Sequence, residues 1–269
     1  MTYQNFKNLF IFLTLISMSN IYPMMRALNT AATGMKAQEE HVNTISNNIA
    51  NSNTTGYKAS RTEFEDLMYE TIKEPGSRSS ADTTYNVGIQ LGSGAKLSGT
   101  NKIHSQGGIQ ITNSPYDLMV SGDGFFGVIV GNQILYTRDG SFNVNSQGIL
   151  QTRKGYPVYP TITLPPNTKS LNISDAGVVQ AYLSNQLEPI GLGTIPIFTF
   201  VNPKGLKDMG GNLAKQTVAS GQPIENIAGD DNAGAIAQGS LETSNVNVMT
   251  EMTNLIKAQR SYEMNSKVM

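Results

Sequence analysis

The chain has 269 residues, a formal net charge of −1 at pH 7, a charged fraction of 14% and no cysteine. This length allows one large domain or two modest ones with a real hydrophobic core. The near-neutral charge provides no basic face for nucleic acid, and the absence of cysteine excludes disulfides and thiolate metal sites. Asn, Ser, Thr, Gln and Gly fill most polar positions, and such a hydrogen-bonding surface suits contact with further copies of the chain.

Residues 1–23 differ in composition from the rest of the chain. One lysine precedes the apolar run LFIFLTLI at 9–16, and the small residues SMS follow at 17–19. One interpretation is a secretory signal peptide, since the run is too short to span a bilayer. The other is an added leader in front of a true start at Met24 or Met25.

Helical periodicity follows over residues 26–49, within a predicted N-terminal region of 24–69. Apolar side chains recur every seven residues and form one stripe: Leu28, Met35, Val42 and Ile49, with Ile45 beside them. Gly34 is the weak position of this helix, costing about 1 kcal/mol relative to alanine. An isolated amphipathic helix is marginal in water, so this stripe needs a partner.

The last segment, 246–269, has the same character. A second apolar face is made by Val248, Met252, Leu255, Ile256 and Tyr262. Asn247 can act as the N-cap, and Glu251 lies in the first turn, where a negative charge is favoured. The chain is therefore expected to carry an amphipathic helix at each end.

Between the helices the pattern is typical of β structure. Turn signals such as GDG at 122–124 and RDG at 138–140 recur about every ten residues and separate short β-prone runs. The predicted fold class is α+β, with a central all-β domain of short antiparallel strands. The predicted boundaries are an extended segment at 70–100, the β domain at 101–224 and a Gly- and Ala-rich linker at 225–245.

No group of residues suggests catalysis, a metal site or a cofactor site. His41 and His104 fall in different elements, and neither has a carboxylate or second histidine at ligand spacing. GDDNAG at 229–234 lacks the alternating aspartates and final glutamate of a calcium loop. We therefore expect a protein that is not an enzyme, without cofactor or small-molecule substrate.

The end of the first helix carries an unusual density of amides. SNNIANSNTTGYK at 46–58 contains Asn47, Asn48, Asn51, Asn53 and then Gly56. Asparagine tolerates left-handed backbone conformations and can hydrogen-bond its own backbone, and Gly56 adds turning freedom. We expect a turn here that leads the chain from the helix into the β domain.

This motif resembles the N-terminal signature of the flagellar axial proteins, the rod and hook family. LETSNVNVMTEMTNLIKAQRSYEMNSK at 241–267 is similar to the matching C-terminal signature, and the two motifs stand in the family's order. The resemblance implies that both end helices pair as a coiled coil in a tubular core. It also favours the added-leader interpretation of residues 1–23, because family members begin near Met24 and leave the cell through the flagellar export channel.

The middle of the chain resembles the distal-rod members of the family. LMVSGDGFF, LYTRDGSFNVNSQGIL and FVNPKGLKDMGGN are similar to their β-domain blocks, and residues 70–94 resemble their long insertion. The implied function is a self-assembling subunit of the rigid periplasmic drive shaft. Implied partners are further copies, proximal rod proteins, the hook protein, the P- and L-ring proteins and the export apparatus. The alternatives are another axial subunit, either proximal rod or hook, and a secreted β-rich binding or adhesin module.

Overall fold

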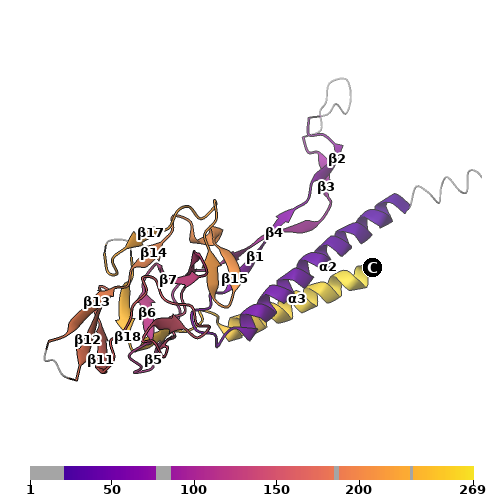
Figure 1. Cartoon of the computed structure of the whole chain (residues 1–269). Helices are drawn as coiled ribbons and strands as arrows, with labels where there is room; N and C mark the ends of the chain where they lie inside the picture. Colours follow the sequence, from indigo (N-terminus) through magenta and orange to yellow (C-terminus); the bar gives the residue numbers. More distant parts are fainter. Residues whose placement is uncertain (1–20, 77–85, 185–187, 231–232) are drawn as a thin grey trace, which may run out of the picture. The chain divides into compact units, whose positions relative to one another are not determined.

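A computed structural model describes residues 21–76, 86–184, 188–230 and 233–269 (Figure 1). The chain forms two compact units, each built from separated stretches: Met1–Asn47, Arg61–Asn101 and Met249–Met269 in unit 1, and Asn48–Ser60 and Lys102–Val248 in unit 2. The predicted leader lies outside the described residues, except for its last three, which begin the first helix. No helix in the described ranges is long and apolar enough to cross a membrane.

Unit 1 contains nearly all of both predicted end helices, α2 (Ile21–Ala50) and α3 (Val248–Val268), and they run antiparallel beside each other (Figure 1). The helices approach closely at Gly34, where an added Cβ would lie 2.9 Å from Asn265 Nδ2. Ala31 on α2 and Ala258 on α3 are also buried. Gly34, the predicted weak position, therefore leaves room for the side chain of Asn265 on the other helix.

The remaining part of unit 1 is a β arm, residues 61–101. Strand β1 (Ser60–Asp66) pairs with β4 (Ala95–Lys102), and β2 (Tyr69–Lys73) pairs antiparallel with β3 (Ile89–Gly92). The arm packs on α2 through a 2.6 Å hydrogen bond between His41 Nδ1 and Thr62 Oγ1. The centre of the predicted insertion, at 77–85, lies outside the described residues.

Unit 2 holds the predicted β domain. Its largest sheet has six strands in the order β15-β16-β8-β7-β14-β17, and a three-stranded sheet has the order β11-β12-β13. The six strands are β7 (Phe125–Val130), β8 (Gln133–Thr137), β14 (Ile197–Thr199), β15 (Lys207–Gly210), β16 (Leu213–Lys215) and β17 (Ile224–Asn226). The three are β11 (Thr168–Ile173), β12 (Val178–Leu183) and β13 (Ile190–Thr194). Their pairings are antiparallel, as expected from the short runs and frequent turns.

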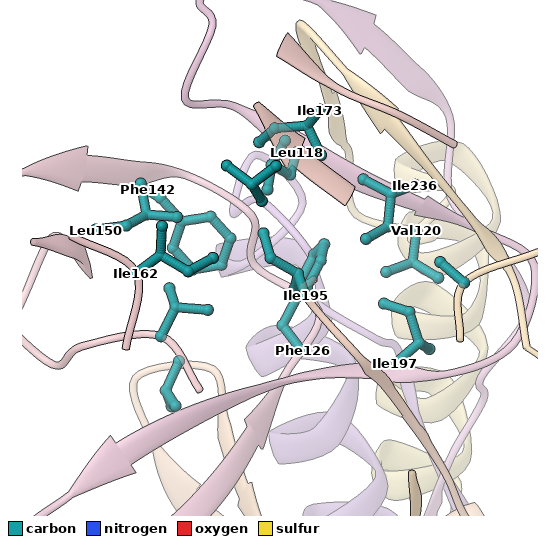
Figure 2. Close-up of a cluster of buried hydrophobic side chains, with 14 of the residues drawn as sticks. Leu118, Val120, Phe126, Phe142, Leu150, Ile162, Ile173, Ile195, Ile197 and Ile236 are labelled. Atoms are coloured by element: carbon teal, nitrogen blue, oxygen red, sulfur yellow. The ribbon is translucent and has the colours of Figure 1, made fainter. Parts of the chain in front are cut away.

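Three two-stranded sheets complete unit 2. Their pairs are β9 (Phe142–Val144) with β10 (Leu150–Thr152), β6 (Leu118–Ser121) with β18 (Ala235–Gln238), and β5 (Ile109–Ile111) with β19 (Ser240–Glu242). A short 3₁₀ helix, Pro203–Gly205, precedes β15. Inward-facing side chains from these strands and the loops between them form the main core, centred on Leu118, Phe126, Phe142, Ile195, Ile197 and Ile236 (Figure 2).

The stretch at 225–245, expected to be a linker, holds most of β17 and all of β18 and β19. Ile236 and Leu241 are buried in it, so this stretch belongs to the β core rather than to a connection. The small residues made the composition of this stretch resemble that of a loop, but they are needed for packing. A Cβ added to Gly234 would lie 2.5 Å from the backbone oxygen of Ser121, so only glycine fits beside β6.

Candidate functional site

The Asn-rich turn is held by the side chain of Asn48, at the end of α2. Its Nδ2 donates to the Ser60 carbonyl at 2.8 Å, and its Oδ1 accepts from the Ser60 amide at 2.9 Å. The same Oδ1 accepts from the Tyr57 hydroxyl at 3.2 Å. Because Asn48 is almost fully buried, these bonds are not exchanged for bonds to water. The amide therefore closes the loop between residues 48 and 60 as a strand partner would.

The other asparagines of the motif have different surroundings. Asn51 Oδ1 accepts from the Thr54 hydroxyl at 3.2 Å, a local turn contact. Asn47 and Asn53 are exposed. The expectation of left-handed asparagines is wrong for this turn, since the positive-φ asparagines of the described chain are Asn113, Asn167 and Asn212. In this motif the asparagines act through hydrogen bonds of their side-chain amides, and a glycine occupies the position with a left-handed backbone conformation.

That glycine is Gly56, with φ at +67°. Its amide donates to the Glu242 carbonyl at 2.8 Å. A Cβ at this position would lie 2.7 Å from the backbone of Arg138 and Asp139, closer than side chains normally come. Both the backbone angle and the close approach require glycine, so Gly56 brings the N-terminal turn against the β domain.

A buried ion cluster lies directly behind this turn. Lys58 Nζ is 2.6 Å from Glu242 Oε1 and donates to the Ser105 carbonyl at 2.8 Å. The Gly107 amide donates to the same carboxylate oxygen at 2.8 Å, and Arg138 Nη1 lies 3.6 Å from the other oxygen. The three charged side chains are between 0 and 4% exposed. Two cations thus share one buried carboxylate.

Burial lowers the pKa of both Lys58 and Arg138, and the Glu242 carboxylate opposes this shift in each case. Arg138 also donates to the Val120 and Gly122 carbonyls, at 3.3 and 2.6 Å. Its guanidinium lies 5.4 Å from the ring centroid of Phe125. The hydrogen bonds of the cluster are directed to fixed backbone groups, so the charges act as structural ties.

Asn245 makes a second tie between the two end motifs. Its Oδ1 accepts from the Ala59 amide at 2.7 Å, and its Nδ2 donates to the carbonyls of Ile103 and Ser105 at 2.8 and 3.1 Å. Together with the ion cluster, this contact fastens residues 56–59 to residues 242–245. We call Asn48, Gly56, Lys58, Arg138, Glu242 and Asn245 the motif clamp.

Sequence reasoning recognised both motifs but did not select Lys58, Arg138, Glu242 or Asn245 as site residues. A usable signal was present, because Lys58 ends the first motif and Glu242 and Asn245 begin the second. A charged residue within each of two distant motifs suggests an ion pair between them. The third member, Arg138, lies in the turn signal RDG and carries no such indication.

His104 lies next to the clamp, edge-on to Phe125 with ring centroids 5.8 Å apart. Burial, and then the positive charges of Lys58 and Arg138, lower the pKa of His104 from 6.5 to about 4. The histidine is therefore neutral at physiological pH. A protonated imidazole would add a third cation beside a single buried carboxylate.

This shift predicts acid sensitivity. Between pH 6.5 and about 4 the unfolded chain binds a proton at His104 and the folded chain does not, so stability falls as the pH is lowered through this window. Allowing for solvent screening of a partly buried group, we expect a loss of about 1–2 kcal/mol. Urea unfolding at pH 7 and pH 4.5 measures it, and His104→Gln should show a smaller difference between the two pH values. An unchanged difference would contradict the assignment.

The residues predicted to form an assembly seam lie on α2 and α3. On α2, Ile45 is buried, while Leu28, Met35, Val42 and Ile49 are partly exposed. On α3, Leu255 is partly exposed, while Val248, Met252, Ile256 and Tyr262 are exposed. The helix pair thus uses small residues for its own contact and leaves most of the predicted apolar stripes accessible.

No group of three or more His, Cys, Asp or Glu that could hold a metal ion occurs among the described residues. His41 bonds Thr62 and contacts Phe64 edge-on, and burial lowers its pKa. The polar side chains that converge among the described residues are those of the motif clamp, and their geometry can fasten the two end motifs of the chain together.

Comparison with known proteins assigns both motifs. Family models match residues 28–58 (flagella basal body rod protein), 119–181 (flagellar hook protein FlgE/F/G D1 domain) and 237–269 (flagellar basal body rod FlgEFG protein C-terminal). The FlgG basal-body rod protein of Buchnera aphidicola from Schizaphis graminum is 46% identical over 245 residues, covering 91% of this chain and 94% of the relative. The chain belongs to the flagellar basal-body rod protein family.

Two further relatives carry the same name. FlgG of Borreliella burgdorferi is 46% identical, with 91% of this chain and 93% of the relative covered. FlgG of Caulobacter vibrioides is 44% identical, with 91% and 94% covered. The protein is a structural subunit of the flagellar basal-body rod, and the matched segments contain the whole motif clamp: Asn48, Gly56 and Lys58 in the first, Arg138 in the second, and Glu242 and Asn245 in the last.

Proposed function

We propose that this chain is the distal-rod subunit, which polymerises into a straight shaft that transmits torque from the motor to the hook. The identity to relatives named FlgG, 44 to 46% over most of the chain, supports this choice over a proximal rod or hook subunit. In this proposal the neighbours are other copies, the proximal rod proteins, the hook protein and the P- and L-ring proteins, after delivery by the export apparatus. Catalysis has no part in it.

The observation that carries the proposal is the pair of accessible stripes on α2 and α3. Val248, Met252 and Ile256 follow one another at four-residue spacing, so they lie in a row along α3. Gly34 and Ala258 mark the side on which each helix contacts the other. Around each helix axis, the apolar stripe lies roughly 100° away from that contact, in the same rotational sense on α2 and α3. In an antiparallel pair, stripes turned in the same sense lie on the same side. The helix pair therefore presents one continuous apolar side.

An apolar side of this kind is typical of a surface that other helices cover. In the proposed rod, copies pack these sides together as a tubular coiled coil with the heptad stripe of α2 inside. The motif clamp complements this arrangement, because residues 48–60 and 242–248 of unit 2 adjoin the two helices along the chain. Buried hydrogen bonds and ion pairs there resist relative motion of the two chain segments.

Electron microscopy of isolated basal bodies labelled with an antibody against this chain tests the proposal. We expect label on the rod between the cell-proximal end and the hook. Label on the hook alone would contradict the distal-rod assignment. If intact basal bodies carried no label although the same cells contained the protein elsewhere, the rod assignment itself would be contradicted.

A further inference from the structure

Methionine is concentrated on the two end helices. Six of the twelve methionines of the chain lie there: Met24, Met25 and Met35 on α2, and Met249, Met252 and Met264 on α3. None of these six side chains is buried, whereas Met119 on β6 is 2% exposed. Because the chain contains no cysteine, the methionine thioethers are its oxidisable sulfur groups. The end helices are therefore a place where oxidation can change the surface of the protein.

Two of these methionines belong to the accessible row of apolar side chains on α3. Met249, Met252 and Ile256 follow one another at spacings of three and four residues, which place them on one face of the helix. Their side chains are 75%, 49% and 52% exposed. Ala258, which marks the side facing α2, is buried instead. Folding of the single chain therefore leaves both methionine side chains accessible to a dissolved oxidant.

Oxidation gives this face a chemical character that a buried seam does not accommodate. A methionine sulfoxide is polar and its oxygen accepts hydrogen bonds, whereas the thioether is an apolar and adaptable side chain. In the free subunit, water solvates this oxygen. In a seam it would lie beside Ile256, and the hydroxyl of Thr253, next to Met252, already donates to the Met249 carbonyl at 2.9 Å. A buried acceptor without a partner is costly, so oxidation disfavours the polymer more than the monomer.

We propose that Met249 and Met252 form an oxidation site that controls the entry of a subunit into the polymer. Hydrogen peroxide transfers one oxygen atom to the thioether sulfur: the O–O bond breaks, the S–O bond forms, and the second oxygen leaves as water. The sulfur loses two electrons and the peroxide gains them. Two thiols of a methionine sulfoxide reductase reverse the change, since the sulfoxide oxygen leaves as water and the thiols become a disulfide. This inference rests on the proposed polymerisation through the apolar side of the helix pair.

The free and the assembled subunit differ in access to this site. In the polymer, the copies that cover the helix pair also cover both sulfurs, so an assembled subunit is protected and a free subunit is not. A pulse of hydrogen peroxide applied to the full-length monomer and to pelleted polymer, followed by mass spectrometry of the digested peptides, measures this access. We expect about fivefold less sulfoxide at Met249 and Met252 in the polymer, and none at the buried Met119 in either state. Equal oxidation of the two methionines in both states would overturn the site.

Polymerisation of oxidised subunits provides the second readout. We expect peroxide treatment of the monomer to raise the concentration needed for polymerisation by about tenfold. In the double variant Met249→Leu with Met252→Leu, the same treatment should raise it by less than about twofold. The quantity compared is the ratio of treated to untreated protein within each variant, so a direct effect of leucine on the seam cancels. Met209→Leu is the matched control, because Met209 is 53% exposed on β15, outside the end helices, and this variant should keep the full ratio.

Enzymatic reduction separates this site from general oxidative damage. Methionine sulfoxide reductases for both sulfoxide epimers, supplied with a thiol reductant, should restore the polymerisation of the treated chain. Inhibition of the double variant as large as that of the unsubstituted chain would overturn the oxidation site alone. Inhibition that persists after mass spectrometry shows both sulfoxides reduced would overturn it as well. Failure of the untreated, unsubstituted chain to polymerise would instead overturn the proposed function.

Discussion

Glu242→Gln is expected to lower the stability of unit 2 by about 3–5 kcal/mol. The change keeps the shape of the side chain but removes the only carboxylate that lies between Lys58 and Arg138 in the clamp. Both cations would then be buried without the carboxylate that contacts them directly, a far larger cost than the loss of a surface ion pair. Urea unfolding followed by the β-sheet circular dichroism signal measures the change.

The cluster contains two cations and one carboxylate, so the loss of a cation can be compared with the loss of the carboxylate. Lys58→Met removes one cation but leaves Arg138 with Glu242, so it should cost less than Glu242→Gln. Glu225→Gln on the exposed strand β17 is the matched control and should change stability by less than about 0.5 kcal/mol. A loss for Glu242→Gln no larger than this control would show that the buried cluster does not stabilise unit 2.

The pH dependence of the same variant separates charge from shape. Burial already lowers the pKa of Lys58 from 10.5, and loss of the carboxylate removes the group that opposes this shift. In the folded variant the pKa of Lys58 should therefore lie further below that of the unfolded chain. The deficit attributable to Lys58 should shrink as the pH rises toward 10.5, since the unfolded chain then loses the same proton.

Ile256→Asp and Met252→Asp are expected to abolish polymerisation while leaving the monomer folded. The two side chains are 52% and 49% exposed in the single chain, so a charge at either position remains in water. In a polymer that covers the apolar side of the helix pair, the same charge is buried at a cost of several kcal/mol per subunit. Sedimentation and electron microscopy measure polymer, and circular dichroism confirms that the monomer is folded.

Ala258→Asp places the same charge at a position that is already buried in the single chain, in contrast to the two stripe variants. Ala258 is buried in the single chain, so aspartate there should destabilise the monomer's helix pair itself. Lys257→Glu, exposed and adjacent, is the control for a charge change that should disturb neither state strongly. Normal filaments from both stripe variants would show that Met252 and Ile256 do not lie in a buried seam.

Local sequence patterns were sufficient for the elements and for the family. The seven-residue spacing of Leu28, Met35, Val42 and Ile49 predicted α2, and the C-terminal periodicity predicted α3. Turn residues between short apolar runs predicted the antiparallel β domain. These features depend on neighbours within a few positions, because helix and strand periodicities are local properties of the chain.

Contacts between distant positions were decided only by the tertiary structure. Lys58 and Glu242 are 184 positions apart, and no periodicity relates them. The same reason applies to Gly34, which propensity describes as a weak helix position until Asn265 is found against it. It also applies to 225–245, whose small residues suggest a linker until β6 is found beside Gly234. A residue's own preferences are written in the sequence, but the cost or benefit of burying it depends on which remote group the folded chain brings to it.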